Sequence, residues 1–65
     1  MELTRINDTW FIKTDINNYY FIEYHEDEKR YKVFLDEYID EHLDSHPVMF
    51  SDEDFKTCLG WCVRN

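Results

Sequence analysis

The stretch TWFIKTDINNYYFIEYH, residues 9–25, decides the fold because it predicts a β-hairpin. Residues 9–16 and 19–25 are rich in β-branched and aromatic side chains, which favour strands. Between them, Asn17 and Asn18 tolerate positive φ, as a two-residue hairpin turn requires. The polar loop 26–29 then leads to a third predicted strand at residues 30–34. A fourth strand at residues 3–6 is left open.

A two-residue turn at Asn17 and Asn18 predicts that Phe11 faces Tyr24 on the next strand. Through the following loop, Tyr24 is expected to face Tyr31. One sheet face then collects the better core residues: Phe11, Tyr20, Ile22, Tyr24, Tyr31 and Val33. The other face carries four large apolar residues among charged ones: Trp10, Ile12, Phe21 and Phe34. This second face is expected to be either covered or used for contact with a partner.

From Leu35 onward the apolar residues recur with helical spacing, and Pro47 ends the pattern. A second helix is predicted after Ser51 as N-cap, with three acids in its first turn. One face of this helix carries Phe55, Cys58, Leu59 and Cys62. The expected fold class is therefore α+β: a small antiparallel sheet of three or four strands followed by two helices. Residues 1–65 are expected to form a single domain, since so short a chain holds one domain at most.

The net charge of −8 and the pI near 4.6 disfavour direct binding to nucleic acid or to an anionic membrane. They favour a basic protein as partner. The first residues, MELTRINDTW, do not resemble a secretory signal, and no apolar run is long enough to cross a membrane. Two cysteines without a secretory signal indicate reduced thiols, so a cytoplasmic location is expected.

The acidic residues are concentrated in residues 33–55, which hold eight acids and no Lys or Arg. Asp36 and Asp40, like Glu37 and Glu41, form like-charge pairs at i,i+4, which destabilise a helix. A solvated helix face could avoid this cost, so the pattern favours a surface that meets a basic partner, although a merely solvated face stays the alternative. The predicted partner-binding residues are Asp36, Glu37, Asp40, Glu41 and Asp44, aided by Asp52, Glu53 and Asp54.

In composition alone, the chain is similar to small acidic proteins of phages and mobile elements that imitate nucleic-acid charge. This resemblance implies a non-enzymatic inhibitor that binds a basic, nucleic-acid-binding protein. The alternative is a structural or adaptor module, dimeric or zinc-stabilised, that makes contact through Trp10, Ile12, Phe21 and Phe34. No enzyme is expected, because the sequence contains no glycine-rich phosphate loop, GxSxG or HExxH motif.

No cofactor is expected, but one zinc hypothesis stays open. His42 and His46 lie at i,i+4, and so do Cys58 and Cys62, so each pair can direct two ligands from one helix face. Their order is the reverse of the usual finger, in which the cysteines come first. Buried cysteines that pack as small apolar residues are the alternative interpretation.

Overall fold

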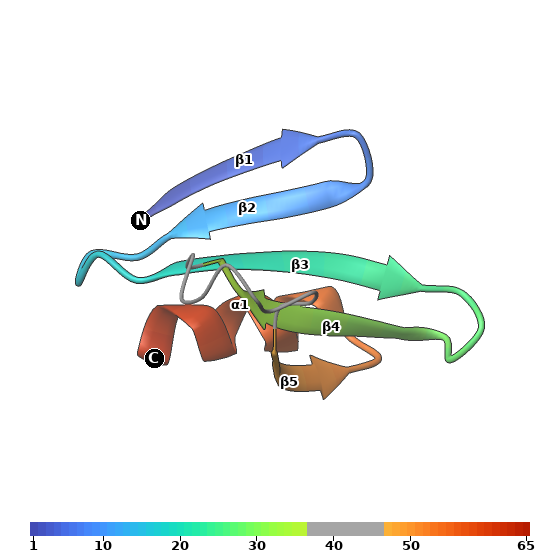
Figure 1. The fold of residues 1–65 in the computed structure, drawn as a ribbon. Coiled ribbons are helices and arrows are strands. Elements are labelled where there is room, and N and C mark those ends of the chain that lie inside the picture. The colour runs from blue at the N-terminus through green and yellow to red at the C-terminus, as the bar shows by residue number, and fades with distance from the viewer. Residues whose placement is uncertain (37–46) are drawn as a thin grey trace.

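A computed structural model describes residues 1–36 and 47–65, which form a five-stranded antiparallel sheet and one helix. The strands lie side by side in chain order, and each pairs with the next (Figure 1). The elements are β1 (Glu2–Ile6), β2 (Thr9–Lys13), β3 (Tyr19–His25), β4 (Arg30–Leu35), β5 (Val48–Asp52) and α1 (Phe55–Arg64). The fold is therefore an up-and-down sheet with a helix packed on one face.

The prediction of three or four strands followed by two helices is wrong, because the sheet has five strands and the described residues contain one helix. β1 is the strand that the sequence left open. β5 was missed, although Val48 and Phe50 are strand-forming residues directly after a proline. β4 continues through Leu35, where the first helix was expected to begin. Residues 37–46, the rest of that expected helix, lie outside the described residues.

The predicted C-terminal helix is present, but it begins later than expected. Its N-cap is Asp54, whose side chain accepts a hydrogen bond from the Thr57 amide at 3.1 Å. Ser51, the expected N-cap, lies in β5 instead. There its hydroxyl accepts a hydrogen bond from Nε of Arg30 at 2.8 Å, and β5 is thereby tied to β4.

The predicted register between β2 and β3 is wrong by three residues, because Phe11 pairs with Phe21 rather than with Tyr24. The turn has three residues, 15–17, and not two: the Thr14 amide donates to the Asn18 carbonyl at 2.9 Å. Asn17 takes the left-handed position of this turn, with φ of 61°. An odd shift moves every side chain of a strand to the other face. The predicted pairing of Tyr24 with Tyr31 is confirmed.

The core lies between α1 and one face of the sheet. Its buried residues come from three strands and the helix: Ile12, Tyr20, Ile22, Val33, Cys58 and Cys62. Trp61 of α1 stacks on Phe50 at a centroid distance of 5.6 Å and meets Tyr20 edge-on at 5.4 Å. The helix packs mainly against β4 and β5, whereas β1 is exposed along its whole length. The β1 edge of this face is therefore open to solvent.

The left-handed conformation at Asn17 generates a test of the backbone conformation of this turn. We expect Asn17→Gly to leave the free energy of unfolding nearly unchanged, because glycine adopts positive φ readily. Asn17→Ala should lower it by about 1 kcal/mol, because alanine is strained there. Ile16→Ala is the control, since Ile16 lies in the same turn and is 68% exposed. Urea denaturation measures all three, and an Asn17→Ala loss no larger than that of Ile16→Ala would contradict this turn.

Candidate functional site

Three separate connections lie at one end of the sheet: the β1–β2 turn, the β3–β4 turn and the link from β5 to α1 (Figure 1). Strands that alternate in direction bring every second connection to the same end. Seven of the eleven acids in residues 1–36 and 47–65 lie here: Asp8, Glu26, Asp27, Glu28, Asp52, Glu53 and Asp54. We call this set the acidic end. Six of the seven are exposed, and Asp52 is half-buried.

Basic side chains neutralise only part of the acidic end. Lys32 forms an ion pair with Glu28, and Arg5 lies 3.6 Å from a carboxylate oxygen of Asp8. Within the described part of the chain, Glu26, Asp27 and Glu53 form no ion pair. Lys29 and Lys56 are also exposed in this region. Arg30, which hydrogen-bonds Ser51 next to Asp52, also lies here. The acidic end therefore carries seven carboxylates against five basic side chains, an excess of two negative charges.

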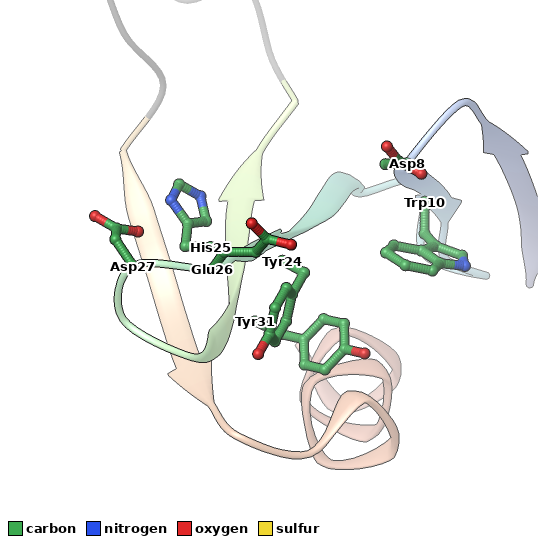
Figure 2. A pocket seen from close by; sticks show the side chains of 7 residues that line it. All are labelled: Asp8, Trp10, Tyr24, His25, Glu26, Asp27 and Tyr31. Carbon is green, nitrogen blue, oxygen red and sulfur yellow. The ribbon is translucent and has the colours of Figure 1, made fainter.

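An open groove of about 770 Å³ lies at the same end of the molecule (Figure 2). Aromatic and acidic side chains line it: Asp8, Trp10, Tyr24, His25, Glu26, Asp27 and Tyr31. The Tyr24 and Tyr31 rings meet edge-on, with centroids 4.9 Å apart. Trp10 meets Tyr31 at 6.0 Å and an interplanar angle of 66°. The rings thus stand at steep angles to one another and form walls rather than one flat stack.

The register and the helix together hold these rings in place. Tyr24 and Tyr31 are cross-strand partners, so their side chains share one face of the sheet. Trp10 reaches that face from β2, because it pairs with Ile22. Phe55, the first residue of α1, supports both Trp10 at 4.8 Å and Tyr31 at 5.5 Å between ring centroids. The groove is therefore backed by the apolar core, while its mouth is acidic.

The structure separates the predicted partner-binding acids. Asp52, Glu53 and Asp54 belong to the acidic end, but Asp36 follows the opposite end of β4. Asp52 pairs with Tyr31, which is five residues before Asp36, so about 17 Å of strand lies between the two acids. The other predicted acids, Glu37, Asp40, Glu41 and Asp44, lie outside the described residues. The described part thus does not unite Asp36 with the acids of residues 52–54.

The predicted apolar contact face is divided by the true register. Trp10 and Ile12 pair with Ile22 and Tyr20, which puts them on the face that α1 packs against. Phe21 and Phe34 remain on the opposite face, where their rings stack at 4.9 Å. Phe11 joins them at 6.0 Å from Phe21, although it was expected in the core. The opposite face therefore carries a row of three phenylalanines.

The cysteine half of the zinc hypothesis lies in the core. Cys58 and Cys62 are both fully buried between α1 and the sheet. The Cys58 sulfur lies 3.9 Å from the carbonyl oxygens of Tyr31 and Asp52. Burial raises the pKa of the Cys62 thiol to about 11, and it also raises that of Cys58, to which nearby Asp52 adds. Zinc binds the thiolate, so these surroundings favour a packing role. His42 and His46 lie outside the described residues.

A different trio of metal-ligand side chains lies at the β3–β4 turn: His25, Asp27 and Glu28, with ligand atoms within 4.8 Å of one another. Glu28 is already ion-paired with Lys32, and both carboxylates are exposed to solvent. These contacts indicate that the three residues are part of a solvated acidic turn and do not form a metal centre.

Because of Cys62, the stability of the fold should decrease at alkaline pH. The folded state binds the thiol proton more tightly than the unfolded chain, in which the pKa of cysteine is 9.0. The resulting stabilisation is complete below that value and is lost as the pH rises toward 11. We expect the free energy of unfolding to fall by about 2 kcal/mol over this range, and to fall less in Cys62→Ala. Equal losses in both proteins would contradict the prediction.

No protein-family model, characterised protein or solved structure matches the chain. No helix in residues 1–36 and 47–65 has the length and apolar character needed to cross a membrane. The functional argument therefore depends on the geometry of the site.

The sequence indicated an acidic surface but not the groove. Tyr24 and Tyr31 were assigned to the core, yet Tyr24 is 43% exposed. Glu26 and Asp27 were counted only as loop residues, and Asp8 was not singled out. A signal was present, since acidic turn residues directly follow an aromatic strand end at residues 24–27. It becomes meaningful only once the sheet order brings Asp8 and Trp10 beside that turn.

Proposed function

We propose that this chain is a non-enzymatic binding protein that inhibits a basic, nucleic-acid-binding protein by occupying its binding surface. The observation that carries the proposal is the acidic end, where three connections and the last residue of β5 bring seven acidic residues to one end of the sheet. A surface that binds phosphates is lined with Lys and Arg, and these side chains pair equally with carboxylates. A compact body with one acidic end can therefore compete with nucleic acid for such a surface.

The sequence pattern supports the same function from a second direction. Residues 37–46 add four acids and no Lys or Arg, so the −8 charge of the chain comes equally from this segment and from the described part. Charge of one sign on a small body steers a partner of opposite sign and speeds association. Binding of this kind weakens steeply with salt.

A second candidate function is an adaptor that makes contact through the sheet face opposite α1. The row of Phe11, Phe21 and Phe34 favours it, because aromatic side chains frequently anchor interfaces. Binding through this row would depend on ring contacts and would withstand salt. The two functions therefore differ in a measurable property.

The proposal is tested by affinity capture from the native host's lysate at about 50 mM and about 300 mM salt. One bait is the wild type, and a second carries Glu26→Gln, Asp27→Asn and Glu53→Gln, which neutralise exposed, unpaired acids of the acidic end. We expect the wild type to retain a nucleic-acid-binding protein at low salt only. The charge variant should lose about tenfold in affinity for that protein, and adding the wild type should displace its nucleic acid.

A control removes the same number of charges elsewhere, through Glu2→Gln, Asp15→Asn and Glu23→Gln. Because Asp15 is ion-paired with the N-terminus and Glu23 lies 3.7 Å from His25, the free energy of unfolding of this control is measured beside its binding. A separate bait neutralises Glu37, Asp40, Glu41 and Asp44, so that their contribution is measured independently. An equal loss of affinity in the acidic-end variant and in the control would show that only net charge matters. That result would contradict a specific role for the acidic end. Binding that persists at high salt but is lost in Phe11→Ser would favour the adaptor instead.

A further inference from the structure

The groove at the acidic end combines two features that a charged surface does not need. Its walls are the rings of Trp10, Tyr24 and Tyr31, and its rim holds the carboxylates of Asp8, Glu26 and Asp27 (Figure 2). The residues that line it include no Lys or Arg. The face of an aromatic ring is negative, so rings and carboxylates both attract a cation. Charge complementarity thus points to a cationic occupant.

We infer that this groove is a receptor for an arginine side chain of the basic partner. The inference rests on the proposed function and adds to it the residue that the partner inserts. A guanidinium group is planar and weakly hydrated, so it stacks on a ring while its N–H groups donate to carboxylates. A lysine ammonium is a compact and strongly hydrated charge that gains less from the rings. A quaternary ammonium has no N–H group to donate to the three carboxylates of the rim.

The chain's own Arg5 shows the same chemistry beside the groove. Its guanidinium carbon lies 5.2 Å from the centre of the Trp10 ring, and its terminal nitrogen lies 3.6 Å from Asp8. Arg5 reaches Trp10 from β1, with which β2 pairs, and it does not line the groove. Trp10 and Asp8 therefore already hold one guanidinium on the β1 side. Tyr24 and Glu26 place a ring and a carboxylate side by side at the other end of the groove (Figure 2).

Backing by the core makes the groove a defined site rather than a patch of mobile side chains. Phe55 packs against Trp10 and Tyr31 from the core side, with distances of 4.8 Å and 5.5 Å between ring centroids. Tyr24 is held edge-on by Tyr31 across the β3–β4 ladder. Rings fixed in this way lose little conformational freedom when a guanidinium stacks on them, which favours binding.

The test is an NMR titration of the full chain with the peptide acetyl-Gly-Arg-Gly-amide at low salt. We expect saturable shifts of the Trp10 indole N–H and the Tyr24 amide, with a dissociation constant of roughly millimolar order. The indole of Trp61 serves as an internal control, because it packs on Phe50 and Tyr20 away from the groove. The matching lysine peptide should bind about three- to fivefold more weakly.

Substitutions at two tyrosines of similar exposure measure the contribution of the ring separately from that of the charge. Tyr24→Leu removes one wall of the groove without changing the net charge, and Tyr19→Leu is its control on the same strand. The two tyrosines are 43% and 41% exposed, and they lie on opposite faces of the sheet. We expect Tyr24→Leu to lower the affinity for the arginine peptide about fivefold, and Tyr19→Leu to leave that affinity unchanged.

The outcomes distinguish this inference from the function on which it rests. Equal affinity for the arginine and lysine peptides, with no effect of Tyr24→Leu, would overturn the arginine site. Binding of tetramethylammonium as tight as that of the arginine peptide would also overturn the arginine site. If an oligolysine peptide still bound the acidic end in a salt-sensitive manner, the proposed function would survive that failure. If none of these cations bound at low salt, the result would contradict both the arginine site and the proposed function.

Discussion

The three-residue turn at residues 15–17 is the constraint on which the rest of the structure depends. It closes with Thr14 opposite Asn18 and holds Asn17 at a φ of 61°. This geometry sets the register of β2 on β3, and the register decides which face each β2 side chain occupies. This register puts Trp10 on the same face as Tyr31, where the two rings meet. With an odd shift Trp10 would point away from α1, and the groove would lose one wall.

The site then follows from the topology rather than from any single motif. In an up-and-down sheet, every second connection lies at the same end, so acids that are distant in sequence become neighbours (Figure 1). One short helix packs mainly on β4 and β5, helps to bury Ile12 of β2 and leaves β1 exposed. The rings at this boundary are backed by the core on one side and reach solvent on the other. Such a boundary suits recognition of a side chain that is both flat and charged.

Local patterns predicted much of the fold, whereas loop geometry and long-range pairing limited the rest. The strand character of β2, β3 and β4 and the amphipathic helix with Cys58 and Cys62 were evident from composition and periodicity. The choice between a two- and a three-residue turn was not, because Asn17 and Asn18 suit either. β5 was missed because Ser51 and the acids after it suit the start of a helix, whereas pairing with β4 keeps residues 48–52 in a strand. The acidic character was visible in the sequence, but the groove required the sheet order.

The most direct test of this account is a nuclear Overhauser spectrum of the aromatic side chains. The account predicts cross-peaks between the indole of Trp10 and the ring of Tyr31, whose centroids lie 6.0 Å apart. It also predicts cross-peaks between the rings of Phe11 and Phe21, which are partners across β2 and β3. Contacts of Phe11 with Tyr24 in place of Phe21 would show the other register, and they would contradict both the groove and its proposed occupant.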